Sequence, residues 1–427
     1  MVSVSLSGVP NSPHELEDYV SALFQSAGYF VEKNITEENV MELDVVATSY
    51  EGVCPEEVLV EAKSAGWGFG DIFKAIGWMR YLSINRGAFF VKDIAGKDLE
   101  EVHSKVAPLG LSFIHLADFS DVTSRFAGAG FPLVHDPIRM TVWRYAYWAE
   151  RNLVSRLRDI AKADPSKEGP IAALRHHRFI NNTIFFVKDL RERLSLLYGA
   201  YMKHPRLACG LAIEMEGGVF VPDAHDPENL TIREALYKGS HLELQACFYL
   251  EHRARLAILK TAIDYECLVE AKRITRQSGT SFDSLPSSFR TGVEQLKREP
   301  FFKRYALFWQ VFLWGFGGFY LKDRQEIEFK WLSKQTGIPI EEIPRALKVF
   351  DVLFPLSQTT SWITEIGKSH CVIVKMVPAP LQGLGANHRK WRYGCKEFAE
   401  FNYTDFTHRD LCKWNNSLVG LLQDKVK

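Results

Sequence analysis

The sequence lacks the patterns that mark several common classes of protein. Its seven cysteines are scattered and odd in number, and none belongs to a CxxC pair, which argues against a disulfide scaffold and a zinc ribbon or finger. The chain contains no Walker A motif and no low-complexity run, so an ATP-driven translocase is not expected. No basic segment followed by an apolar run stands near the start, and we expect a cytoplasmic protein.

Net charge is also absent, because 52 Lys and Arg balance 52 Asp and Glu over 427 residues. That length allows two or three domains. The charge is unevenly distributed: the first 100 residues hold seven Lys and Arg against 16 Asp and Glu, so the rest holds 45 against 36. We therefore expect any polyanionic ligand to be held mainly by the later part of the chain.

Residues 1–120 have the alternating pattern of a small α/β domain. Ser12 can cap a helix that begins at Pro13, and apolar residues at helical spacing continue until Gly28. Val40–Ala47 and Val58–Lys63 read as two strands of a hairpin. The remaining elements of this domain are an extended stretch from Tyr29, a helix over 71–84, a strand over 87–91, a helix over 96–106 and a strand over 112–116.

Two carboxylates and a lysine are expected to meet on this hairpin. Glu61 and Lys63 lie two residues apart on one strand and share a face, while Val60 and Ala62 point into the packing. Asp44 on the neighbouring strand can bring a second carboxylate to the same place. Two adjacent carboxylates repel unless a divalent cation neutralises them. With a lysine beside them, such a group is suited to phosphodiester cleavage.

Asp44, followed after a gap by Glu61-Ala62-Lys63, resembles the signature of the PD-(D/E)xK nuclease superfamily. The flanking sequence strengthens the likeness. Residues 16–29 are similar to the first helix of Mrr-type restriction endonucleases and Holliday-junction resolvases, in which a glutamate, here Glu17, lies eleven residues before a Gly-aromatic pair. Leu43–Ala47 and Arg86–Val91 also resemble their counterparts in that group.

The resemblance covers about residues 12–116 and implies a mixed sheet flanked by helices. It implies that Asp44 and Glu61, with the Ala62 carbonyl, hold Mg²⁺, for which Mn²⁺ can substitute. Glu17 would be a third acidic contributor and Lys63 the catalytic lysine. The implied activity is DNA hydrolysis in prokaryotic restriction or defence against phage. Because cutting two strands needs two sites, it also implies a homodimer or higher homo-oligomer.

The later part of the chain is expected to be mainly helical. Residues 121–140, rich in Gly and Pro, read as a linker, and 141–324 as a helical domain. Within it, Tyr305–Leu321 is a 17-residue apolar stretch that contains Gln310 and three glycines. A buried core helix or a partner-facing element is favoured over a membrane span, and no membrane association is expected.

Residues 325–378 are similar to a winged helix-turn-helix. Ser333, Gly337 and Ile343 fall at the spacing of that motif, and a strand near 371–376 could supply the wing. Its second helix contains few basic residues, so packing against protein is an open alternative to binding DNA. Residues 379–427 read as a basic and aromatic C-terminal extension. The candidate DNA-binding residues are Lys74, Arg345, Lys348, Arg389, Lys390 and Arg392.

The sequence thus favours a metal-dependent DNA endonuclease and leaves two alternatives open. One is a structure-selective repair nuclease of the resolvase type. The other is a DNA-binding regulator that keeps an inactive nuclease-like domain, whose binding would be indifferent to Mg²⁺ and to Lys63→Ala. A trigger or protein partner is not identified by any motif.

Overall fold

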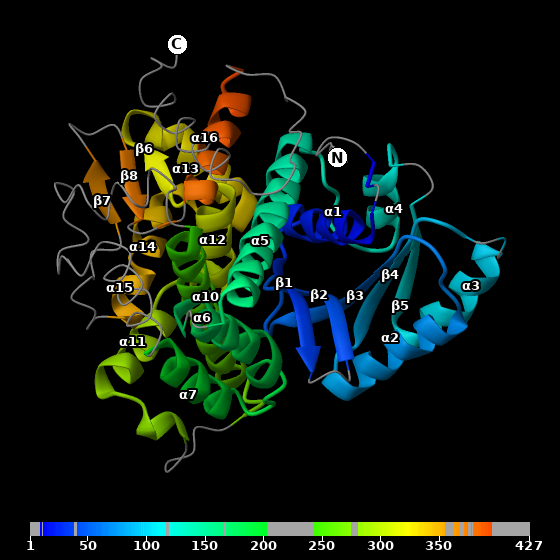
Figure 1. Cartoon of the computed structure of the whole chain (residues 1–427), viewed down its shortest axis with the longest axis horizontal. Helices are drawn as coiled ribbons and strands as arrows, with labels where there is room; N and C mark the ends of the chain where they lie inside the picture. The colour runs from blue at the N-terminus through cyan, green and yellow to red at the C-terminus, as the bar shows by residue number, and fades with distance from the viewer. Residues whose placement is uncertain are drawn as a thin grey trace. The chain divides into compact units, whose positions relative to one another are not determined.

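The structure is a computed structural model that divides into two compact units, the first ending at Trp148 and the second beginning at Ala149 (Figure 1). It describes residues 9–394 except 11, 38–40, 95, 97, 117–118, 166–167, 203–241, 275–280, 355–362, 367–370, 375–376 and 378. Parts of the expected helical domain and winged helix, and residues 395–427 of the expected extension, therefore lie outside the described residues.

The first unit contains the predicted α/β domain. Its five strands form one sheet in the order β1-β2-β3-β4-β5, antiparallel from β1 to β3 and parallel from β3 to β5. The predicted mixed sheet with flanking helices is thus confirmed. The elements are α1 Pro13–Ser26, β1 Phe30–Glu37, β2 Met41–Ser49, β3 Glu56–Lys63, α2 Phe69–Leu82, β4 Arg86–Val91, α3 Leu99–Val106, β5 Leu111–His115 and α4 Val122–Gly128.

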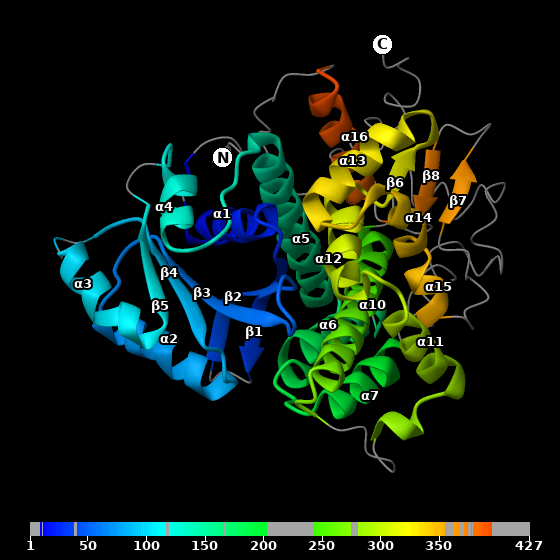
Figure 2. The same ribbon diagram turned by 180° about the vertical axis from the view of Figure 1, so that it is seen from behind.

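Alternation of side chains along β4 assigns the helices to the two faces of the sheet. Phe90 meets Phe24 of α1 edge to face, with ring centroids 6.1 Å apart. Its neighbour Phe89 points to the other face, where its ring stacks on Phe113 at 5.8 Å. The side chain of Met79 in α2 lies on that second face, close to the backbone of β4. Figures 1 and 2 accordingly show α1 against one face, and α2 and α3 against the other.

The segment expected to be a linker, 121–140, carries α4 and the first turn of a long helix, α5. Phe126 and Phe131 from this segment are buried, and both rings pack against Phe24 of α1 at about 5 Å. The hydroxyl of Tyr147, further along α5, donates to Gln25 Oε1 at 3.0 Å. The boundary between the two units therefore lies within α5 rather than at residue 120, because these contacts belong to the core of the first unit.

The second unit is mostly helical, as predicted. Three short strands form an antiparallel sheet in the order β6-β8-β7. The helices are α5 Pro137–Ala163, α6 Glu168–Phe179, α7 Leu190–Tyr201, α10 Leu242–Glu270, α11 Ser287–Lys297, α12 Tyr305–Gln310, α13 Gln325–Thr336, α14 Ile343–Ala346, α15 Val349–Leu353 and α16 Ala379–Arg392, and the strands are β6 Phe319–Leu321, β7 Ile363–Ile366 and β8 Cys371–Val374.

The apolar stretch 305–321 forms the centre of this unit. It consists of α12, a π-helical turn over Val311–Gly315, and β6. Almost all of its side chains are buried, including Trp309, whose indole nitrogen donates to the Ala346 carbonyl at 2.9 Å. The expectation of a buried core element is confirmed. Among the described residues, none of the helices has the length and apolar character that crossing a bilayer requires.

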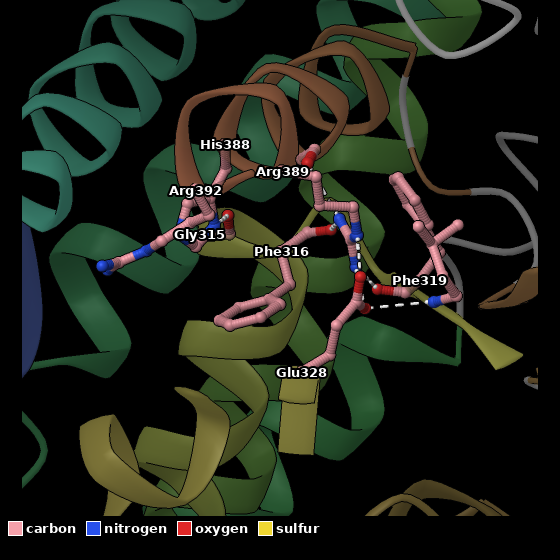
Figure 3. A network of polar contacts seen from close by, with 9 residues as sticks. Gly315, Phe316, Phe319, Glu328, His388, Arg389 and Arg392 are labelled. Carbon is pink, nitrogen blue, oxygen red and sulfur yellow. Dashed lines mark hydrogen bonds and ion pairs between the residues drawn. The ribbon is translucent and has the colours of Figure 1, made fainter. Parts of the chain in front are cut away.

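Arg389 of α16 was expected to contact DNA and is instead fully buried. Its Nε and one terminal nitrogen donate to the two carboxylate oxygens of Glu328, at 2.7 and 2.8 Å. The guanidinium also donates to the carbonyl oxygens of Phe316, Phe319 and Gly385 (Figure 3). These five acceptors engage all five N–H donors of the guanidinium, so Arg389 holds α16 against α13 and the end of the π-helical turn. Arg389 is therefore removed from the DNA-binding candidates.

We predict that Gly385→Ala destabilises the second unit. A Cβ at Gly385 would stand 2.2 Å from the Phe316 carbonyl oxygen, so α16 could not dock as it does. The free energy of unfolding, measured with denaturant, should fall by about 2–3 kcal/mol. The matched control is Gly199→Ala in α7, where a Cβ would meet open space. At that position, the better helix propensity of alanine should raise the free energy of unfolding by about 0.5–1 kcal/mol. Equal stability of the two variants would contradict this role for α16 packing.

Candidate active site

The sheet of the first unit opens between β2 and β3. The last pair of their ladder joins Val45 to Val60. Beyond it, β2 remains paired with β1 and β3 remains paired with β4. In this opening, which we call the fork, the backbone N–H of Ala62 donates to Asp44 Oδ2 at 2.9 Å. The Asp44 side chain thus replaces the strand partner that β3 has lost.

The carbonyl of Ala62 also faces the fork. The next carbonyl along β3, that of Lys63, accepts from Lys92 on the β4 side. Because successive residues of a strand direct their backbone groups to opposite edges, both groups of Ala62 point toward Asp44. The Glu61 side chain, paired in register with Phe89, stands on the face that α2 covers.

Glu61 and Lys63 form a close ion pair on that face, as the alternation predicted. Lys63 Nζ lies 2.5 Å from Glu61 Oε1, with the lysine half-buried and the glutamate only 3% exposed. The second oxygen, Glu61 Oε2, is buried and has no hydrogen-bond partner among the described residues. A buried carboxylate oxygen without a donor costs free energy, which a cation or a water held at the fork would recover.

The carboxyl groups at the fork are hard to ionise. Burial, followed by the charges of Glu61 and Glu17, raises the pKa of Asp44 to about 7, against the opposing Ala62 N–H. Burial likewise raises the pKa of Glu61, although Lys63 opposes it. Burial alone would lower the pKa of Lys63, but its hydrogen bond to Glu61 and the acidic charges nearby outweigh that effect and raise it. The lysine therefore keeps its proton while the two carboxylates compete for ionisation.

Glu17, the expected third acidic residue, remains apart from the pair. It lies on α1 with its side chain 17% exposed, and His14 Nδ1 is 3.5 Å from its carboxylate. Its charge reaches Asp44, as the raised pKa of Asp44 indicates. Across the part of the chain that the structure describes, however, no three His, Cys, Asp or Glu side chains gather in an arrangement that could hold a metal ion.

Helix α2 adds two charges to the site. Lys74, an expected DNA-binding residue, is exposed, and its charge lowers the pKa of Glu61. Its Nζ lies 4.3 Å from the ring centroid of Trp78, a cation–π contact that sequence analysis did not anticipate. Asp71 was also missed. It raises the pKa of Glu61 and accepts from the Gly68 N–H at 2.8 Å, a capping pattern that the Gly68–Asp71 spacing could have revealed.

The donor set at the fork fits a hard divalent cation. Asp44, Glu61 and the Ala62 carbonyl offer only oxygen atoms, and within the part of the chain that the structure describes, Glu61 Oε2 accepts no hydrogen bond. Mg²⁺ binds proteins in this manner, through one or two carboxylates, with water and substrate phosphate completing its six positions. Two carboxylates and a carbonyl are therefore enough for such a site, and Glu17 is not needed as a direct ligand.

The other expected DNA-binding residues belong to the second unit. Arg345 and Lys348 are exposed, and Arg345 is paired with Glu342 at 3.2 Å. Lys390 and Arg392 are partly exposed on α16. The sequence predicted these four residues and Arg389 alike as DNA-binding candidates, because a short segment does not show which side of a helix is exposed and which is buried.

No family model matches this chain, and neither curated proteins nor solved structures show a similarity to it. The resemblance to PD-(D/E)xK nucleases therefore stays a prediction from the sequence.

We predict that Asp44→Asn stabilises the first unit at high pH in EDTA. With a pKa raised to about 7, folded Asp44 holds its proton more tightly than in the unfolded chain. The penalty for ionising it is therefore full above pH 7 and disappears as the pH falls toward 4. Thermal unfolding at pH 8 should show a gain of about 1–2 kcal/mol, discounted for partial solvent access.

The same comparison at pH 4.5, a condition chosen to lie below the raised pKa, should show little difference. Glu100→Gln, at an exposed position on α3, serves as the control and should change stability little at either pH. A gain for Asp44→Asn that is equal at both pH values would contradict the raised pKa.

Proposed function

We propose that this chain is a divalent-metal-dependent endonuclease that hydrolyses phosphodiester bonds in DNA. One observation carries the proposal. At the fork, the charge of Glu61 contributes to the raised pKa of Asp44, and Lys63 Nζ lies 2.5 Å from Glu61 Oε1. Glu61 Oε2 is buried and has no hydrogen-bond donor among the described residues. A purely structural ion pair would not require the second carboxylate or leave that oxygen unsatisfied.

In this mechanism, Asp44, Glu61 and the Ala62 carbonyl would hold Mg²⁺, which lowers the pKa of bound water and polarises the phosphate. Lys63 keeps its proton, since its pKa is raised, and its ammonium stabilises the charge that develops on the phosphate oxygens. Asp44 also holds the Ala62 backbone toward the fork. Lys74, kept in place by Trp78, contributes a contact to a neighbouring phosphate of the substrate.

The second unit is proposed to contribute target recognition through a winged helix. The elements proposed to form this winged helix are, in chain order, α12, β6, α13, α14 with α15, β7 and β8, and β8 lies between β6 and β7 in the sheet. That order is typical of winged-helix domains. Gly337, in the left-handed conformation at φ +70°, ends α13 where the expected turn falls. Arg345 and Lys348 are exposed on the helices that follow.

The biological role and assembly follow from the resemblance. Cleavage of both strands of a duplex requires two active sites, so we propose a homodimer. A role in prokaryotic restriction or defence against phage is proposed on the same basis.

The decisive experiment is cleavage of supercoiled plasmid, methylated and unmethylated, in Mg²⁺ or Mn²⁺. Asp44→Ala, Glu61→Ala and Lys63→Ala should each reduce cleavage by about 10²-fold or more, because each removes a group that acts in the transition state. The matched control is Lys105→Ala, which removes an exposed lysine paired with Glu101 on α3 and should cut like the wild type. Normal cutting by two of the three site variants would overturn the assignment.

A binding assay separates the nuclease from the regulator alternative. Wild-type protein that never cuts, but binds a specific duplex equally well with or without Mg²⁺ and with Lys63→Ala, would favour a DNA-binding regulator. Cleavage confined to branched DNA would instead favour the repair nuclease.

Cleavage should also depend on pH through Asp44. At subsaturating Mg²⁺, the rate should rise as the pH increases toward about 7, because the metal competes with the proton on Asp44. Raising the Mg²⁺ concentration should move the midpoint of this profile to lower pH. A midpoint that does not respond to the metal concentration would mean that another group controls the rate.

A further inference from the structure

One side of α13 presents cations and an aromatic ring. Ile327, Trp331 and Lys334 follow one another at intervals of three and four residues, and Arg324 precedes them by the same interval, so the four share one side. Ile327 is 39% exposed, Lys334 is exposed, and Arg324 and Trp331 are partly exposed. None of these four positions holds an acid.

The end of α16 extends this side into a layered surface. The guanidinium of Arg392 lies 5.7 Å from the centroid of the Trp331 ring, and the ring of Tyr393 lies 5.2 Å from it. The guanidinium of Arg324 in turn lies 5.7 Å from the Tyr393 ring. Guanidinium groups and aromatic rings from α13 and the end of α16, some 60 residues apart in sequence, thus lie next to one another on this surface. The α13–α16 face is formed by Arg324, Ile327, Trp331, Lys334, Arg392 and Tyr393.

The position of Arg392 is fixed by the buried network beneath it. Its Nε donates to His388 Nε2 at 3.1 Å, and His388 Nδ1 therefore carries the proton that it shares with the Gly315 carbonyl at 3.1 Å. Arg389, in the same turn, anchors α16 through Glu328. Figure 3 shows the Arg392 side chain extending away from this network. A surface held in this way loses little conformational entropy on binding a ligand.

The charge of the α13–α16 face distinguishes it from the second helix of the proposed winged helix. Around α14 and α15, the exposed cations Arg345 and Lys348 are balanced by exposed Glu341 and Asp351. Among the described residues, three cations of the α13–α16 face stand beside two exposed acids, Asp323 and Glu326, and Glu326 is paired with Lys330 at 2.6 Å. A polyanion is therefore attracted more strongly to the α13–α16 face.

We propose that the α13–α16 face binds single-stranded DNA. The rings of Trp331 and Tyr393 stack on bases, while Arg324, Lys334 and Arg392 contact phosphates. Stacking requires unpaired bases, since those of a duplex already stack on one another, and the alternation of rings and cations matches the combination used by proteins that bind single strands. The choice of DNA rests on the proposed nuclease function, but the binding itself requires neither Lys63 nor a metal ion.

The test is fluorescence anisotropy of a labelled oligo-dT strand with the full chain in EDTA. Trp331→Ala should weaken binding about tenfold, as expected for loss of one stacked base, and Trp331→Phe should recover most of the affinity. Arg392→Ala should weaken binding and reduce the slope of log K against log salt by about 0.7, the value for one phosphate contact on a single strand. Arg392 lies at the surface, so this variant tests the proposal even if Trp331→Ala fails to fold.

The matched control is the double variant Glu326→Gln/Lys330→Gln, on the same helix, which removes an acid and the base paired with it together and leaves the net charge unchanged. It should bind within twofold of the wild type. No binding by the wild type, or equal binding by the wild type, Trp331→Ala and Arg392→Ala, would overturn the proposal. A duplex that competes as well as the single strand would also overturn it. Because the assay contains no metal, loss of plasmid cleavage with this binding intact would reject the nuclease and leave the present inference standing.

Discussion

Strand β3 is the constraint on which the first unit depends, because a strand has only two edges to share. Along one edge, β3 stays paired with β4 up to Lys63, the last residue of β3. Along the other edge, its pairing with β2 ends at Val60. The released edge needs a substitute acceptor for the Ala62 N–H, and Asp44 supplies it. The same step draws the Asp44 carboxylate toward Glu61. The need to satisfy the Ala62 N–H therefore places the carboxyl group of Asp44 near that of Glu61, although their negative charges repel.

The two units bury charge with opposite outcomes. In the second unit, Glu328 and Arg389 neutralise each other, and every remaining guanidinium donor finds a carbonyl, so the pair fixes the position of α16. In the first, Lys63 satisfies one oxygen of Glu61, the described residues offer no donor to Oε2, and Asp44 adds a second acid. Completed networks rigidify a core, whereas incomplete ones have capacity for a ligand.

Local pattern accounts for what could be predicted about the fold. The alternation in 58–63 assigned Glu61 and Lys63 to one face, and the apolar length of 305–321 identified the buried centre of the second unit. Where prediction failed, the missing information was non-local. Arg389 and Arg392 lie three residues apart in one basic and aromatic segment, but only the docking of α16 on Phe316 buries the first and leaves the second at the surface.

The sequence by itself determined the element order of the first unit and the spacing that sets Glu61 beside Lys63, because strand period and capping are properties of neighbouring residues. Tertiary structure alone decided that β2 leaves β3 at Asp44, that Glu17 stays apart from the two carboxylates, and that α5 contains the boundary between the units. It also decided which arginine of α16 is buried. Each of these depends on contacts between segments distant in sequence, whose free energy no local pattern contains.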